Sequence, residues 1–311
     1  MLEVCSVVKP KLFIHGIAIF FAYYFLLPKS VISQDWENYY IIGQTINMLD
    51  ISFLIEKVLS GYLPLSYTTS FLFLTLNYIL TKLSFEMYFF TCLFFNIVLM
   101  TFGLYKNIKI ENLSNKIIYL YLIFFSMGIF ILTGYAFRQS LAISLYLILR
   151  KHDRKNHLLI CLLAIACHVS VIFFILYEFS NLKIKFRKSV VCIFSFLFAV
   201  IFFKYAPILG ELENKFLSTP AMICLVLMLL LHLRTGNSLF SNTSLFLMIF
   251  FGFSFYHGLG DLEMYRLLPI FVILAAIRLQ KLTAFHTTIV ILNFMYFTVF
   301  ITQRNVLDSF S

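Results

Sequence analysis

Two residues that lipid should reject, Arg138 and His168, lie in adjacent apolar runs on either side of a basic turn at 150–155. Each lies about a dozen positions from this turn, which at ~1.5 Å per helical residue places both ~18 Å up a helical hairpin. An arginine in an apolar helix costs roughly 2.5–3.5 kcal/mol on insertion scales, so it normally faces a wet cavity and marks a working site. We therefore interpret this pair as the floor of an active site.

A second arginine, Arg266, resembles Arg138 in its position. Each begins an apolar helix after a loop of small or polar residues, which includes Gly134 in the first case and Asp261 in the second. A guanidinium binds phosphate oxygens through paired hydrogen bonds and keeps its proton, so two of them suit a dianionic group such as a lipid-linked diphosphate. The alternative is that both arginines reach lipid headgroups at the bilayer surface.

Candidate proton acceptors form a second set. Asp35, Glu37 and Asp261 are the acids that the charge pattern places on the outer side, where a general base could take the proton of a sugar hydroxyl. His168 could also accept a proton, because a free imidazole titrates near pH ~6.5. The alternatives are solvated acids and a structural histidine bonded to a carbonyl. The remaining candidates for substrate contact are Tyr39, Tyr135, Gln139, His257 and Tyr265.

Several common chemistries have no motif in the sequence. It holds no D-x-D pair for a divalent metal with a nucleotide diphosphate, and no P-loop, G-x-S-x-G or H-E-x-x-H. The six cysteines are scattered mostly through apolar runs without C-x-x-C spacing, which is typical of packing residues. We therefore expect no metal and no cofactor, and metal-independent chemistry on a lipid-borne substrate is the remaining enzymatic option.

The composition predicts an integral membrane protein. The 311 residues are 61% hydrophobic and 12% charged, with a mean hydropathy of +0.94, so too little polar surface remains to cover a soluble core. At ~20 residues per span, the length accommodates about ten transmembrane helices in one all-α domain, residues 1–311. The net charge of +10 lies in short loops between apolar runs, which follows the positive-inside rule and does not indicate nucleic-acid binding.

Charged loops separate the predicted spans. Residues 28–70 mix acids, aromatics and apolar residues too finely for a span and carry a negative charge, so we expect an extracytoplasmic loop with amphipathic helices. Lysines between 106 and 116 mark a cytoplasmic loop. Residues 71–83 predict a short segment that dips into the bilayer or a tilted span. Full spans are predicted at 12–27, 85–104 and 117–133, in the run from Arg138, and at 190–203, 221–233, 245–255, 267–277 and 289–301.

The basic residues at 183–188 conflict with this order of spans. The positive-inside rule predicts that they are cytoplasmic. Only one ordinary span, 158–179, separates them from the cytoplasmic turn at 150–155, and one span would place them on the outer side. Either the charge rule fails here, or the helix breaks around 166–170, at His168, and the chain turns back. Non-helical backbone at membrane depth is tolerated only around a protein-lined cavity.

The segment GYAFRQSLAISLYLILRKHDRKNHLLICLLAIACHVSVIFFI closely resembles the signature of EpsG-like, Wzy-type polysaccharide polymerases. Shared features are Arg-Gln before a small-residue helix, a basic turn, and an apolar helix that ends in His and a small residue. The earlier DWENYY resembles the Asp and Tyr loop of this family, and LTLNYILTKLSFEMYFF resembles its next element. The resemblance covers 35–179, about half of the chain.

This resemblance implies a GT-C-like fold and a glycosyltransferase that moves a glycan from undecaprenyl diphosphate to the non-reducing end of another lipid-linked repeat unit. The reaction would take place at the periplasmic face of the bacterial inner membrane, with a chain-length regulator as a candidate partner. Arg138, Gln139 and His168 match the family block directly. Arg266 departs from it, because the family's late arginine is often followed by aromatics, whereas Leu-Leu-Pro follows here.

Two other classes of protein stay open at this point. A lipid-linked oligosaccharide flippase or transporter also has many spans and buried cations, although such folds usually show paired halves and none is visible here. A membrane acyltransferase needs a catalytic histidine with a second polar residue on the outer side, and His168 alone does not establish one.

Overall fold

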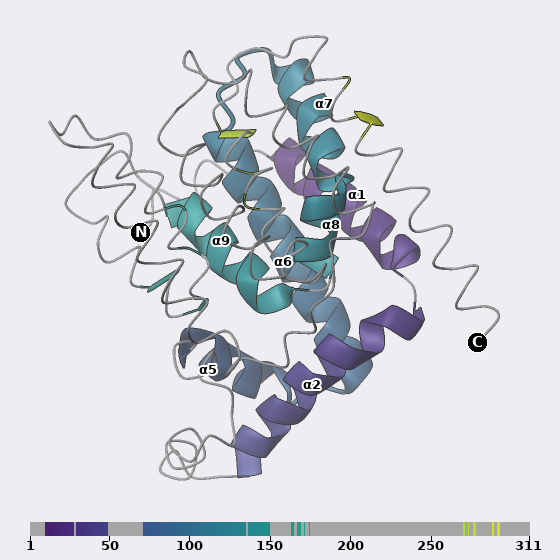
Figure 1. The fold of residues 1–311 in the computed structure, drawn as a ribbon, viewed down its shortest axis with the longest axis vertical. Coiled ribbons are helices and arrows are strands. Elements are labelled where there is room, and N and C mark those ends of the chain that lie inside the picture. The colour runs from purple at the N-terminus through teal and green to yellow at the C-terminus, as the bar shows by residue number, and fades with distance from the viewer. Residues whose placement is uncertain are drawn as a thin grey trace, which may run out of the picture.

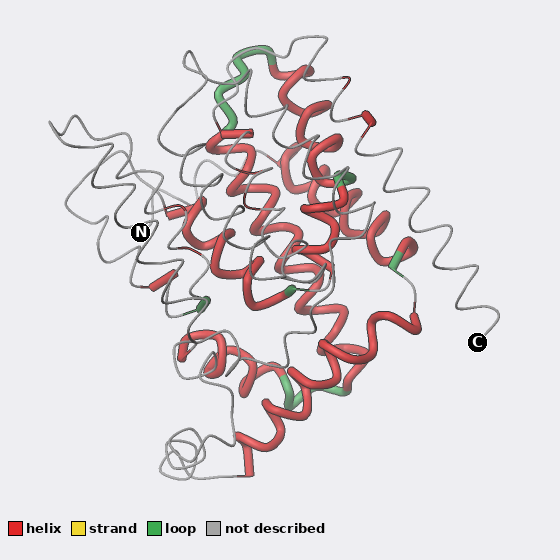
Figure 2. Tube along the Cα trace, in the orientation of Figure 1, coloured by secondary structure: helices red, strands yellow, loops and turns green. Residues whose placement is uncertain are grey.

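The computed structural model describes residues 10–27, 29–48, 71–134 and 136–149, together with single positions between 163 and 292. Helices are the regular elements of this part of the chain, and none of its residues lies in a strand (Figures 1 and 2), so the expected all-α class is confirmed for it. The predicted spans beyond 179 lie outside the described residues, apart from a few single positions. The helices are α1 (Pro10–Leu26), α2 (Lys29–Met48), α5 (Phe71–Leu80), α6 (Phe85–Asn107), α7 (Leu113–Phe124), α8 (Met127–Gly134) and α9 (Phe137–Leu149).

α6 is the central helix. Ser84 caps its start by accepting a hydrogen bond from the backbone N–H of Met87, and Glu86 in the first turn complements the helix dipole. Its 23 residues rise ~35 Å, enough for a hydrocarbon core of ~30 Å. Within the described residues α6 is the one helix whose length and composition suit a membrane span, which confirms the helix predicted at 85–104. Shorter apolar helices are Leu12–Leu26, Leu113–Phe124 and Phe137–Leu149.

α9 runs parallel to α6 and packs closely on it. Ser144 Oγ of α9 donates a hydrogen bond to Met100 Sδ of α6 over 3.7 Å. About one turn further along both helices, a Cβ added at Gly103 would meet the Cβ of Leu147 at 2.8 Å. Small residues at such a crossing allow two helix backbones to approach closely, as they do in membrane bundles. The N-terminal ends of α6 and α9 therefore lie at the same end of the bundle.

α1 lies on another side of α6 and runs in the opposite direction. Near its start Phe13 packs against Phe94, and near its end Tyr24 packs against Phe90. Its outer face is apolar and exposed, with Phe25 80% exposed. The helix ends at Leu26, close to the predicted end of the first span, because Pro28 follows and disfavours helical backbone before it.

The predicted span at 117–133 is wrong as a single helix, because the chain forms α7 and α8 with a break at Phe125 and Ser126. Two side chains take the backbone carbonyls at the break: Ser126 Oγ donates to Ile123 O at 2.6 Å, and the Tyr23 hydroxyl of α1 donates to Phe124 O. The next helix then starts with Phe130 N–H donating to Ser126 O. These bonds replace part of the helical ladder and separate the two segments.

The helix directions define two ends of the bundle (Figure 1). At one end α1 and α8 finish, with Gly134 of α8 against Leu27, and α6 and α9 begin. α2 and α5 lie across this end, which we call the Trp36 end. At the other end α6 and α9 finish and the loop 108–112 leads into α7, and we call it the Lys106 end.

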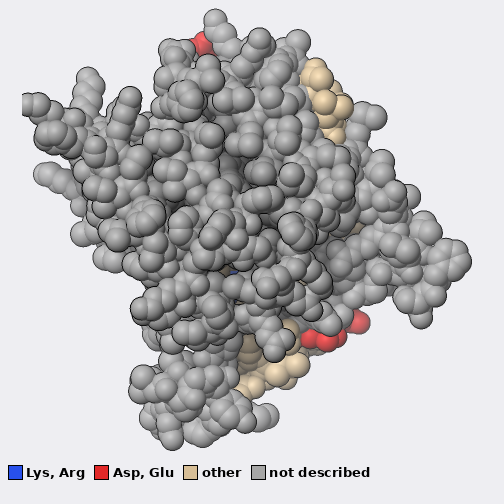
Figure 3. Space-filling view, in the orientation of Figure 1, with Lys and Arg blue, Asp and Glu red and all other residues tan. Residues whose placement is uncertain are grey.

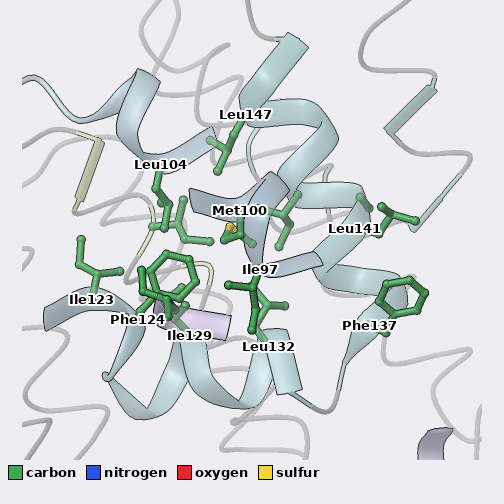
Figure 4. Close-up of a cluster of buried hydrophobic side chains, with 14 of the residues drawn as sticks. Ile97, Met100, Leu104, Ile123, Phe124, Ile129, Leu132, Phe137, Leu141 and Leu147 are labelled. Atoms are coloured by element: carbon green, nitrogen blue, oxygen red, sulfur yellow. The ribbon is translucent and has the colours of Figure 1, made fainter. Parts of the chain in front are cut away.

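A continuous apolar core joins the helices between these ends. Side chains from α6, α7, α8 and α9 meet there, and Figure 4 shows Met100 and Ile97 of α6 among them. Close packing of this kind fixes the relative positions of the helix ends. The buried members labelled in Figure 4 are Ile97, Met100, Leu104, Ile123, Phe124, Ile129, Leu132, Phe137, Leu141 and Leu147.

Candidate functional site

Arg138 is the second residue of α9, at the Trp36 end. Its side chain is half-buried, its Nε atom is buried, and the neighbouring Gln139 is only 5% exposed. The start of a helix carries partial positive charge from its first backbone N–H groups. This charge adds to that of the guanidinium, so the two together favour an anionic ligand at the start of α9.

Trp36 of α2 holds the turn that precedes Arg138. Its indole Nε1–H donates a hydrogen bond to Gly134 O at 2.8 Å, and Gly134 is the last residue of α8. Its ring lies 5.1 Å from that of Phe137, the first residue of α9, at an interplanar angle of 31°. Trp36 is fully buried and also packs edge-on against Phe89 of α6. One side chain therefore contacts both sides of the α8–α9 turn.

The acids predicted to act with Arg138 flank Trp36 on the same helix. Asp35 and Glu37 are its neighbours in α2; Glu37 is exposed, and the side chain of Asp35 lies outside the described residues. Figure 3 shows acidic atoms where α2 and the start of α6 lie, and a second acidic spot over the loop at the Lys106 end. The backbone thus brings the start of α9 and the acid-bearing segment of α2 to one end of the molecule.

Tyr39, the other α2 residue predicted to contact substrate, belongs to the packing between α2 and α5. Its ring lies 5.3 Å from that of Phe73, and its backbone carbonyl accepts a 2.6 Å hydrogen bond from Asn77 Nδ2. Asn77 Oδ1 in turn accepts a bond from the hydroxyl of Tyr88 on α6. This buried polar chain fastens α2, α5 and α6 together. α5 itself rises only ~15 Å, too little to cross a ~30 Å hydrocarbon core.

His168 is half-buried and lies outside helical backbone. The backbone N–H of His168 donates to Ala164 O, four residues earlier, at 3.1 Å. Its backbone carbonyl accepts from Val171 N–H, three residues later, at 3.4 Å. A helical bond before His168 is therefore followed by a tighter turn after it. The alternative of a helix break at His168 agrees with these described positions.

A contact across α9 argues against the straight hairpin expected from the sequence. The rings of Tyr146 and Phe174 lie 5.5 Å apart. Tyr146 is four residues before the basic turn at 150–155, whereas a continuous helix would carry Phe174 ~28 Å beyond that turn. Two side chains cannot bridge such a difference in level. The contact therefore favours the alternative in which the helix breaks at His168 and the chain turns back, and the equal depth of Arg138 and His168 stays a prediction.

Several predicted site residues lie outside the described residues, so their positions stay predictions. Among the described positions, none of the His, Cys, Asp and Glu side chains gather in a group of three that could hold a metal ion. The predicted residues outside the described part are Tyr135, His257, Asp261, Tyr265 and Arg266.

The Lys106 end uses its polar side chains differently. Lys106 Nζ donates to Ile148 O at 2.7 Å, and Asn107 Nδ2 donates to Leu147 O at 2.7 Å and to Gly103 O at 2.8 Å. Ile148 and Leu147 belong to the last turn of α9, where helix carbonyls lack partners within the helix. Both side chains of α6 therefore cap α9 and fix its position along α6.

Sequence reasoning missed Trp36, Asn77 and Asn96. Asn96 is fully buried and donates from Nδ2 to Thr133 O at 3.0 Å, which ties α6 to α8. A signal was present, since each asparagine interrupts an apolar run, and polar residues inside apolar helices commonly join neighbouring helices. Trp36 is the single tryptophan of the chain and stands between two acids, but its partners lie about 100 residues away.

Comparison of the chain with family models, with curated proteins and with solved structures finds no match. The functional assignment therefore depends on the residues and their geometry.

Proposed function

We propose that this protein is a multi-spanning membrane glycosyltransferase that joins undecaprenyl-diphosphate-linked repeat units into a polysaccharide, such as an O-antigen, capsule or exopolysaccharide. It would act at the outer face of the bacterial inner membrane without a metal. The support is the resemblance of 35–179 to EpsG-like, Wzy-type polymerases, together with the packing of the Trp36 end.

The observation that carries the proposal is the contact between Trp36 and the α8–α9 turn. Arg138 and the acids of α2 are about 100 residues apart in the chain, and a site that uses both requires that they lie together. Trp36 of α2 bonds to Gly134 and contacts the ring of Phe137, so α2 lies next to the start of α9. Arg138 follows Phe137 directly.

The direction of the helices supports the outer location. α1 and α7–α8 run toward the Trp36 end, whereas α6 and α9 run away from it. The segment 106–116 at the opposite end holds three lysines and one glutamate, and in the sequence the basic residues of 150–155 come directly after α9. Under the positive-inside rule that end faces the cytoplasm, so the Trp36 end faces outward.

The proposed reaction breaks the bond between the anomeric carbon of the donor sugar and its phosphate, and forms a bond from that carbon to an acceptor hydroxyl oxygen. The electron pair leaves with undecaprenyl diphosphate, and Arg138 stabilises the negative charge that grows on the phosphate. Arg266 is proposed to bind the same group. The hydroxyl proton passes to Asp35 or His168 acting as a general base.

Lipid-linked glycan from cells with and without the chain tests this proposal. A polymerase null should accumulate single repeat units on the lipid carrier at the outer face, while wild-type cells show a ladder of lengths. Absence of repeat units from the outer side would indicate a flippase, and an unchanged ladder with lost acyl groups would indicate an acyltransferase. Either result would contradict the polymerase proposal.

A further inference from the structure

We infer that Trp36 is a positioning residue that sets the place of the Arg138 guanidinium and reports on its occupation by a diphosphate. The inference rests on the proposed function for its ligand, and on the packing around the α8–α9 turn for its geometry. Trp36 lies in α2, and neither the family resemblance nor the sequence motifs assign it a role.

The first step concerns the hydrogen bond. Gly134 is the last residue of α8, and Trp36 Nε1–H donates to its carbonyl at 2.8 Å in a buried setting. A buried carbonyl that loses its donor is left without the water that would replace it, so this bond favours the present position of the turn. Residue 134 is thereby fixed relative to α2.

The second step concerns the ring. The Trp36 ring is tilted against that of Phe137, with an interplanar angle of 31°, and Phe137 also packs against Phe73 of α5 at 5.8 Å. Phe89 of α6 closes the other side of the indole at 5.1 Å. The first residue of α9 is held between α2 and α5, and α6 supports the indole, which leaves the next residue, Arg138, little freedom along the helix axis.

The third step concerns the other side of the turn. Gly134 abuts Leu27 at the end of α1, since a Cβ added there would lie 2.8 Å from Leu27 Cδ2. The turn is therefore enclosed by α1 on one side and by Trp36 on the other. When an anion binds, a shift of Arg138 also moves the neighbouring Phe137. The ring of Phe137 contacts the indole of Trp36, so the indole environment changes as well.

The guanidinium of Arg138 can stabilise the diphosphate only if it lies at the correct position. A misplacement of ~1 Å at a reacting group can lower the rate by up to ~10²-fold. Trp36→Phe keeps an aromatic ring over Phe137 but removes the N–H donor to Gly134. We expect this variant to bind a prenyl diphosphate about tenfold more weakly than the wild type, with the protein still folded in the membrane.

The first measurement uses farnesyl diphosphate with the purified full chain in nanodiscs, and follows both radiolabelled binding and tryptophan emission. The emission reports Trp36 alone, because the chain has one tryptophan. We expect saturable binding with a change in emission, loss of both in Arg138→Ala, and about tenfold weaker binding in Trp36→Phe. Equal binding by Trp36→Phe and the wild type, or binding without a change in emission, would overturn the positioning role.

The second measurement does not depend on the ligand. Hydrogen exchange at the backbone amides of 136–140 should be faster in Trp36→Phe, since the bond from Ser140 N–H to Ala136 O forms the first turn of α9. Phe20→Leu is the matched control, because its buried ring contacts only α1 and α6 among the described ring contacts. Unchanged exchange in Trp36→Phe would refute the role of Trp36.

The two measurements separate the two proposals. If farnesyl diphosphate does not bind to the wild type, the diphosphate chemistry of the proposed function fails, and hydrogen exchange still decides whether Trp36 sets the turn. If the ligand binds and Arg138→Ala abolishes binding, while Trp36→Phe changes neither binding nor exchange, the proposed function stands and the positioning role is wrong.

Discussion

The two ends of the bundle use similar polar residues for different purposes. At the Lys106 end, Lys106 and Asn107 donate to the last carbonyls of α9, so these side chains complete a helix. At the Trp36 end, an exposed acid, Glu37, and a half-buried arginine, Arg138, lie on two helices that a buried tryptophan holds together. The comparison teaches that Lys106 and Asn107 complete a helix at one end, whereas Glu37 and Arg138 at the other end are the groups that we propose meet a ligand.

Among the variants of the two ends, substitution of Arg138 should have the largest effect on activity. Arg138→Ala removes a permanent cation from the Trp36 end, and loss of a group that stabilises growing charge typically lowers a rate by ~10²–10³-fold. We expect the glycan ladder to disappear while the protein remains in the membrane at wild-type amounts. Gel analysis of lipid-linked glycan and a blot of the membrane fraction measure these outcomes.

Lys116→Ala is the matched control for that variant. Lys116 is also a half-buried cation, but it lies over the ring of Tyr105 at the Lys106 end, with Nζ 4.4 Å from the ring centroid. Its replacement should leave the ladder unchanged. A normal ladder from Arg138→Ala, or equal loss from both variants, would remove the functional distinction between the two ends.

Alanine at two tightly packed glycines should separate stability from activity. A Cβ at Gly43 would clash with Thr81 Cγ2 and lie 2.8 Å from Asn77 Nδ2 at the Trp36 end, and a Cβ at Gly103 would lie 2.8 Å from Leu147 Cβ toward the Lys106 end. Overpacking of this kind costs about 1–3 kcal/mol. We expect both variants to unfold at lower temperature in detergent, and Gly43→Ala to lose activity beyond its loss of folded protein, because α2 must move.

Gly16→Ala is the control for both glycine variants, since its nearest neighbour, Val98 Cγ2, would lie at an ordinary 3.6 Å. Alanine is favoured over glycine inside a helix by about 0.8–1 kcal/mol, so this variant should be neutral or slightly more stable. Equal unfolding temperatures for Gly16→Ala and Gly103→Ala would show that the close approach of α6 and α9 is not as described.

The smallest effect is expected from Asn107→Ala at the Lys106 end. The variant loses hydrogen bonds to Leu147 O and Gly103 O, each worth about 0.5–1.5 kcal/mol. The free energy of unfolding should fall by about 1–2 kcal/mol, and activity per folded molecule should stay at the wild-type value. Loss of activity without loss of stability would assign this end a functional role that the comparison denies it.

The sequence predicted the helices whose ends are set by residues close to them in the chain. α1 and α6 agree with the predicted spans at 12–27 and 85–104, because long apolar runs bounded by Pro28 and by the Ser84 cap leave few alternatives. The break between α7 and α8 was not predicted, since its causes include the Tyr23 hydroxyl, which reaches Phe124 O from a helix about 100 residues earlier.

The site shows the same limit. Arg138 was singled out as a candidate because it is a cation in an apolar run. This choice requires no knowledge of its neighbours in the fold. The role of Trp36 depends on Gly134 and Phe137, which only the fold brings to it. The sequence left open whether the helix breaks at His168, and the contact of Tyr146 with Phe174, which only the fold supplies, favours the break.

The central claim is that the two ends lie on opposite sides of a membrane, with the Arg138 end outside. Two-sided labelling tests it most directly, using single cysteines at exposed Glu37 and exposed Lys109 in an active variant that lacks the six native cysteines. A membrane-impermeant maleimide should label position 37 in intact spheroplasts, and position 109 only after permeabilisation. Labelling of both positions from the same side, or of position 37 only after permeabilisation, would contradict the claim.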